Sequence, residues 1–175
     1  MKHASRLPTI LYALSWAIMA LLPAALAYAA FAGVFGEDAL MHAFPQAVGS
    51  GGLGPWQVAG ATILGLMPWG VVMWLLWRIR GLFDRYRRGK GLTLGAAGDI
   101  RTIGLGLVVL GMVKVAAHTG QILILSATNA EGERILALQF GTGEIGFLFA
   151  GGLMLAIGQS MREAVAAVEE LRGFV

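Results

Sequence analysis

The sequence contains no cysteine and few charged residues, and both shortages narrow what the chain can be. Without cysteine there is no disulfide, no thiolate metal ligand and no cysteine nucleophile. Only 13% of the 175 residues are charged, whereas 57% are hydrophobic and the mean hydropathy is +0.73. A soluble domain of this size needs a far more polar surface, so the composition indicates a membrane protein.

Motifs for catalysis and for cofactor binding are also missing. The three histidines (His3, His42 and His118) have no cysteine or membrane-centred carboxylate beside them, which is a poor ligand set for a metal or haem. No catalytic triad is apparent, and the glycines lack the strand-to-helix context of a phosphate-binding loop. We therefore expect no catalytic residues, no metal and no cofactor; a haem shared by two copies of His118 is a weaker alternative.

Four apolar stretches are long enough to cross a bilayer as helices, at residues 7–35, 56–77, 102–126 and 144–160. The first ends near a sequence that resembles a signal-peptidase site, but it is about twice as long as the apolar region of a signal peptide. The chain is thus predicted to be a single all-α membrane domain over 1–175, a bundle of four transmembrane helices. The helical pattern continues from the fourth span into a C-terminal helix at 161–175.

The distribution of lysine and arginine predicts the orientation. Eleven of the thirteen lie near the N-terminus, in the connection 78–101 or in the C-terminal helix, whereas only Arg134 lies in another connection and Lys114 lies within a span. Positive residues favour the cytoplasmic side of a membrane. Both termini and the basic connection are therefore predicted to be cytoplasmic.

The basic connection at 78–101 is the densest cluster of charge. Its position beside two spans favours anionic lipid headgroups as the first contact, rather than nucleic acid. The simplest interpretation is a loop that only sets orientation, and the alternative is a docking surface for lipid or an acidic protein. The side chains available for such contacts are Arg78, Arg80, Arg85, Arg87, Arg88 and Lys90.

Two further patterns concern helix packing. Apolar residues recur at helical spacing from Met161 to Leu171, so the C-terminal helix could fold back on the basic connection or offer this stripe to a partner. Gly152, Ala156 and Ser160 form a small-residue stripe on the fourth span. We expect this stripe to pack within the bundle, with homo-oligomerisation as the alternative.

Lys114 is the least ordinary residue, because it lies near the middle of the third span. It is 13 residues from Arg101, a distance of about 20 Å along a helix, and lysine at a helix centre costs about 2.5–3.5 kcal/mol on insertion scales. The spacing places it on the helical face of Gly104 and Gly111, where another helix can approach closely. It should therefore face the bundle interior.

A polar intramembrane cluster around Lys114 is predicted to contain His118, Gln121 and Glu144. His118 and Gln121 follow Lys114 by four and seven residues on one helical face. Glu144 is the obvious acidic partner, but residue counting places it about 8–13 Å nearer the outer end. The cluster could fix helix register, bind a ligand or proton, or contact another subunit.

The basic connection and the C-terminus resemble a family of small bacterial membrane proteins. The matching residues of the connection are Leu82, Phe83, Tyr86, Gly89, Thr93, Ile100, Arg101 and Gly104, and the C-terminal acids are Glu169 and Glu170. In these positions the chain resembles the four-span proteins known as domain of unknown function 2975. The resemblance implies a bacterial inner-membrane protein of unknown activity, in a family often encoded beside a small helix-turn-helix regulator.

The function predicted from these features is that of a non-enzymatic membrane partner. It would be an accessory or regulatory subunit for a cytoplasmic regulator or a membrane complex, acting through the basic connection and the C-terminal helix. The alternative is a small oligomeric transporter, or an ion or proton conduit, that uses Lys114 and His118.

Overall fold

A computed structural model describes residues 6–48, 52–89, 91, 93–129 and 140–172. These residues form five helices and no strand: α1 (Arg6–Phe31), α2 (Glu37–Ala43), α3 (Pro55–Arg87), α4 (Leu94–Leu125) and α5 (Thr142–Arg172). All except α2 are long and apolar enough to cross a membrane. The predicted all-α fold with four membrane-crossing helices is confirmed.

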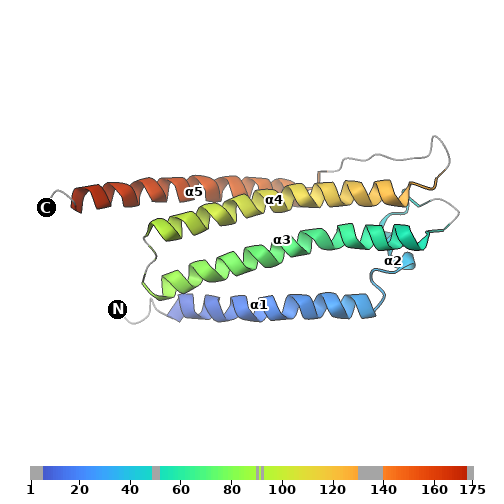
Figure 1. Ribbon diagram of the computed structural model, residues 1–175, viewed down its shortest axis with the longest axis horizontal. Helices are drawn as coiled ribbons and strands as arrows, with labels where there is room; N and C mark the ends of the chain where they lie inside the picture. Colours follow the sequence, from blue (N-terminus) through green and yellow to red (C-terminus); the bar gives the residue numbers. More distant parts are fainter. Residues whose placement is uncertain (1–5, 49–51, 90, 92, 130–139, 173–175) are drawn as a thin grey trace.

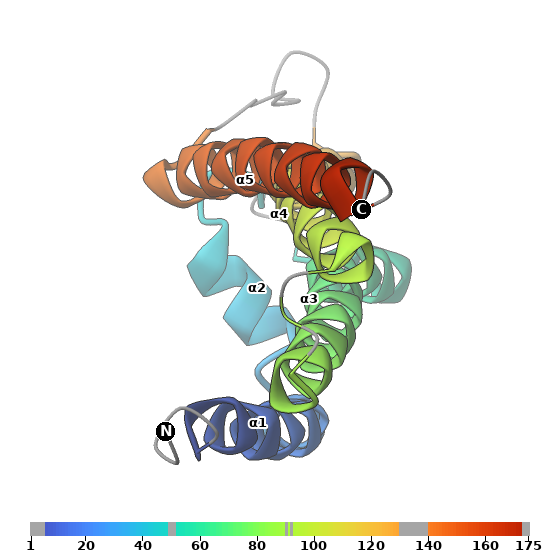
Figure 2. The same ribbon diagram turned by 90° about the vertical axis from the view of Figure 1, so that its left-hand side faces the viewer.

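The four long helices lie side by side in the order α5, α4, α3, α1, and together they form a curved row (Figures 1 and 2). In the most apolar part of α4, 44% of the residues are buried, against 6% in α1 and 11% in α3 and α5. α4 is therefore the centre of the molecule. The other helices leave wide apolar faces uncovered, which suits a chain whose surroundings are lipid.

Glycines bring α4 and α5 into close contact. A Cβ atom added at Gly104 would lie 2.8 Å from the backbone oxygen of Gly151, and one added at Gly151 would lie 2.7 Å from the backbone oxygen of Gly104. The face predicted from Gly104 and Gly111 is thus the contact with α5. The prediction that Gly152, Ala156 and Ser160 pack within the bundle is wrong, because all three are exposed.

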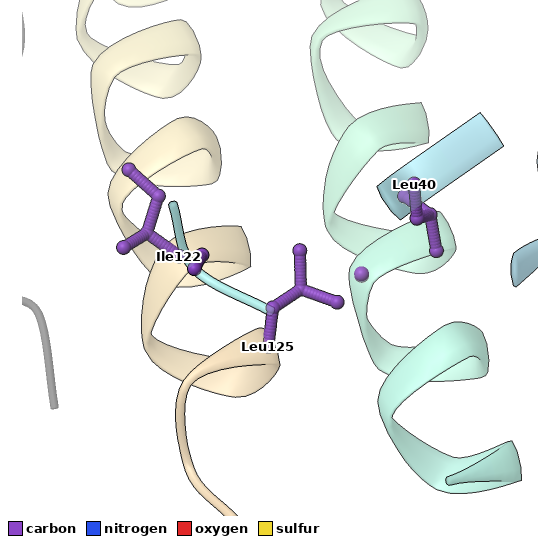
Figure 3. Close-up of a cluster of buried hydrophobic side chains, with 5 residues drawn as sticks. Leu40, Ile122 and Leu125 are labelled. Atoms are coloured by element: carbon purple, nitrogen blue, oxygen red, sulfur yellow. The ribbon is translucent and has the colours of Figure 1, made fainter. Parts of the chain in front are cut away.

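The short helix α2 lies within the connection between α1 and α3. Leu40 of α2 joins Ile122 and Leu125 of α4 in a buried apolar cluster, and Leu125 points into the space between α4 and α3 (Figure 3). Figure 2 shows α2 on one side of the curved row. This cluster fixes α2 against the end of the molecule opposite the chain termini (Figure 1).

The basic connection is mostly helical rather than a loop. Residues 78–87 continue α3 without a break, and α4 already begins at Leu94. Gly89 has φ +72°, a conformation that glycine adopts easily, and the side chain of Thr93 accepts a hydrogen bond from the Ala96 N–H at 3.3 Å. Gly89 therefore follows the end of α3 in a turn, and Thr93 caps the start of α4.

The C-terminal helix does not fold back within the described residues. α5 runs from Thr142 to Arg172 as one helix, so the fourth span and the segment beyond residue 160 are continuous (Figure 1). Met161 and Val165 are half-buried, whereas Val168 is 50% exposed. Between Met161 and Val168, the apolar stripe is thus partly covered at its beginning and uncovered at Val168.

Candidate functional site

Lys114 and Glu144 form an ion pair between α4 and α5. The Lys114 Nζ lies 2.8 Å from Glu144 Oε1 and 5.4 Å from the centre of the Phe147 ring. The prediction that Glu144 lies nearer the outer end is wrong. The backbone oxygen of Glu144 lies beside Gly111, so α5 begins level with the middle of α4 rather than with its end (Figure 1).

Glu144 lies in the first turn of α5, and this location favours an acidic side chain. The first backbone N–H groups of a helix have no partner within the helix, and they carry a partial positive charge. The Glu144 carboxylate is beside Gly141 at the helix start. Lys114 balances the negative charge. The pair therefore places a carboxylate where the helix start favours one and leaves no net charge in an apolar layer.

His118 and Gln121 lie farther along the same side of α4. The ring centre of His118 is 5.3 Å from that of Phe44, and its nitrogens have no hydrogen-bond partner among the described residues. The Gln121 amide nitrogen donates to the backbone oxygen of Ala61 at 2.9 Å, which ties α4 to α3. The predicted cluster thus consists of one ion pair and two neighbouring polar side chains.

All four residues line one cavity of about 560 Å³, which we call the mid-span cavity. Its walls come from α3, α4 and the first turns of α5, and most of them are apolar. From Lys114 toward Arg101, the next residues on the same face of α4 are Gly111, Leu110 and Leu107, and none of them is polar. Within the described residues the polar row therefore ends at Lys114. The wall residues besides the four polar ones are Gly65, Pro68, Trp69, Val72, Leu110, Val115, Ala117, Gly141 and Phe147.

At the opposite end of α3, three ion pairs hold the arginines of the basic connection. Arg85 Nε lies 2.6 Å from Asp99 Oδ2, which links α3 to α4. Asp84 forms ion pairs with two arginines near the end of α3. Its Oδ1 lies 2.9 Å from Arg87 Nη2, and its Oδ2 lies 2.6 Å from Arg88 Nη2. Such exposed pairs contribute little to stability, but they fix where the guanidinium groups point.

Aromatic side chains contact Arg78, Arg80 and also the ion-paired Arg87. Arg80 stacks on Trp16 at 4.3 Å and Arg87 on Tyr12 at 4.8 Å, so both contact α1. Arg78 lies 5.4 Å from the ring centres of Trp74 and Trp77. Cation–π contacts and a row of Trp and Tyr near a helix end are typical of a membrane interface.

The arginines surround a second cavity of about 380 Å³, which we call the basic cavity. Its charged lining is four arginines and two aspartates, an excess of two positive charges: Arg78, Arg80, Arg85, Arg88, Asp84 and Asp99. The Nε of Arg78 is buried and has no hydrogen-bond partner among the described residues. Arg87 lies next to this cavity without lining it, and Lys90 lies outside the described residues.

Several residues that build these sites are not apparent from the sequence. Tyr12 and Trp16 are spaced by four residues, which is a weak signal for one helical face, but nothing in the sequence indicates that they receive arginines from α3. Trp69 and Phe147 look like ordinary membrane residues, yet they form walls of the mid-span cavity. Among the described residues, no group of three His, Asp or Glu side chains suits a metal ion.

No protein-family model, curated protein or solved structure matches the chain.

Proposed function

We propose that the protein is a multi-pass protein of the bacterial inner membrane that serves as a non-enzymatic partner of another protein. Four apolar helices support the membrane location. The excess of Lys and Arg at the end that holds the α3–α4 connection supports an orientation with both termini in the cytoplasm (Figure 1). The bacterial inner membrane rests on the sequence resemblance given above.

The basic cavity is the observation that carries this proposal. Four arginines line a space of about 380 Å³, and only two aspartates among the lining residues balance them. Aromatic rings and carboxylates hold them in place, so little side-chain entropy is lost when an anion binds. The first contact is an anionic lipid headgroup, and an acidic surface of a partner protein engages the same end.

The C-terminal half of α5 is the second contact. Its apolar stripe is uncovered at Val168, and α5 extends past the first turn of α4 (Figure 1). An amphipathic helix with one free face is a common means of binding a partner protein. The resemblance to the four-span family favours a cytoplasmic regulator, although a membrane complex or a second copy through Gly152, Ala156 and Ser160 fits the same surfaces. A conduit is less favoured because the polar row ends at Lys114.

Native mass spectrometry of the full-length protein, purified in mild detergent from its own membranes, tests the proposal. We expect one protein partner and retained phosphatidylglycerol or another anionic lipid. The triple variant Arg85→Glu, Arg87→Glu, Arg88→Glu should lose both, whereas the charge reversal Asp38→Arg on exposed α2 should keep both. The same partner and lipids on the triple variant, or no partner on the wild type, would refute the role assigned to the basic end.

A further inference from the structure

The mid-span cavity is not used by the proposed function. Its volume of about 560 Å³ lies within the range of small-molecule sites, and apolar walls with a few polar groups are the usual composition of such sites. Trp69 and Phe147 supply flat aromatic walls. Lys114, His118 and Gln121 supply the polar groups.

The polar groups have unused hydrogen-bonding capacity. An ammonium group carries three N–H donors, and Glu144 is the only carboxylate that contacts Lys114 within the described residues. The His118 nitrogens have no hydrogen-bond partner in the same part of the chain. Gln121 uses its amide nitrogen on Ala61, which leaves its oxygen as an acceptor. The cavity thus offers several groups to a ligand without breaking an existing contact.

The charges at the cavity select a neutral ligand. Lys114 and Glu144 cancel one another at 2.8 Å. A ligand carboxylate would compete with Glu144 for Lys114, and a ligand cation would meet the charge of Lys114. An unpaired charge in an apolar environment is very unfavourable. A neutral molecule with a hydrogen-bond acceptor gains a contact with Lys114. It neither displaces Glu144 nor brings a second positive charge close to Lys114.

The depth of the cavity favours a ligand that dissolves in the apolar layer. Lys114 lies 13 residues from Arg101, about 20 Å along α4. The apolar layer is about 30 Å thick, so a layer that begins near Arg101 contains Lys114 about 10 Å from its other face. A molecule that dissolves in the hydrocarbon layer reaches it directly.

One end of the cavity lies near α2. His118 lines the cavity, and its ring contacts that of Phe44, which follows the last residue of α2. Figure 2 shows α2 on one side of the helix row, and α1 and α5 form the two ends of that row.

We infer that the mid-span cavity binds a neutral, lipophilic ring carbonyl compound, with the chemistry of a quinone. Its carbonyl oxygen accepts a hydrogen bond from Lys114, and its ring lies beside Trp69. The binding does not depend on the partner role of the basic end.

Photolabelling of the full-length protein in lipid nanodiscs tests this inference. The probe is a benzoquinone with an azido group and a decyl chain, and the labelled peptides are mapped by mass spectrometry. We expect labels within 65–72 and 110–121. Decylubiquinone should compete with the probe at a concentration about tenfold lower than its 1,4-dimethoxybenzene analogue, which has the same chain but no carbonyl oxygens.

Matched variants locate the binding site. Trp69→Ala should weaken labelling, whereas Trp56→Ala at the exposed start of α3 should not. The double variant Lys114→Met, Glu144→Gln keeps the site neutral and should abolish the difference between the two competitors. Labels spread over exposed residues such as Ile63, equal competition on the wild type, or a phospholipid in the cavity that decylubiquinone does not displace would each overturn the inference.

Discussion

At the scale of single residues, the Lys114–Glu144 pair meets two needs that neither residue meets alone. Glu144 lies in the first turn of α5, where the helix start favours a negative charge, and Lys114 neutralises that charge. A buried pair is often no better than two apolar residues, but removal of one partner leaves an unbalanced charge. The two substitutions should therefore be strongly coupled.

Lys114→Met is expected to lower the free energy of unfolding by about 3 kcal/mol, the lower end of the range for a broken buried pair. The lower end applies because the side chain of Lys114 is 39% exposed. The double variant Lys114→Met, Glu144→Gln should recover most of this loss, since it leaves no unbalanced charge at the pair. Unfolding in mixed micelles, followed by circular dichroism, measures both. Equal losses in the single and double variants would show that the pair is not coupled.

Spacing along one helix predicts which face Lys114 occupies, because helical periodicity is a local property. The position of Glu144 along the bundle axis is not a local property, because it depends on the register in which α5 packs against α4. Gln57 illustrates the same limit. It is 1% exposed, and its amide donates to the backbone oxygens of Ile124 and Leu125 at 3.1 Å. In the sequence, Gln57 is only a polar residue at the start of a span.

At the scale of helices, Gly104 and Gly151 set the distance between α4 and α5. A Cβ atom added to either glycine would lie less than 3 Å from the backbone oxygen of the other. The heptad spacing of the glycines on α4 predicts this contact face correctly. On α5 the sequence offers two sets of small residues, and only the shape of α4 decides that Gly151 and Gly158 are the ones in contact.

Gly151→Ala and Gly152→Ala make a matched pair of substitutions. A methyl group at Gly151 would lie 2.7 Å from a backbone oxygen, whereas one at Gly152 would meet nothing within 4 Å. We expect Gly151→Ala to destabilise the protein by about 1–3 kcal/mol through overpacking. Gly152→Ala should be neutral or slightly stabilising, because alanine favours a helix. Thermal unfolding in detergent compares them, and similar melting temperatures would contradict the observed contact.

At the scale of the molecule, the curved row has two inner helices, α3 and α4, and two outer helices, α1 and α5. α3 lies between α1 and α4, and α4 lies between α3 and α5, whereas α1 contacts mainly α3 and α5 contacts mainly α4. Composition predicts four spans because hydropathy needs no tertiary information. It does not predict their order in the row, since apolar faces that contact lipid and apolar faces that contact protein have similar sequences.

The proposed orientation gives the last prediction, because the chain contains no cysteine that would react with a thiol reagent. Asp38 is exposed on α2, and the side chain of Arg88 is 65% exposed between α3 and α4, at the opposite end (Figure 1). In intact cells, a membrane-impermeant maleimide should label the Asp38→Cys variant and not the Arg88→Cys variant. In inside-out membrane vesicles the pattern should reverse, and a permeant maleimide should label both variants in either preparation. Labelling of Arg88→Cys alone in intact cells would mean that the basic end faces outward. Anionic headgroups of the cytoplasmic leaflet could not then be its ligand, because they would lie across the membrane from the arginines.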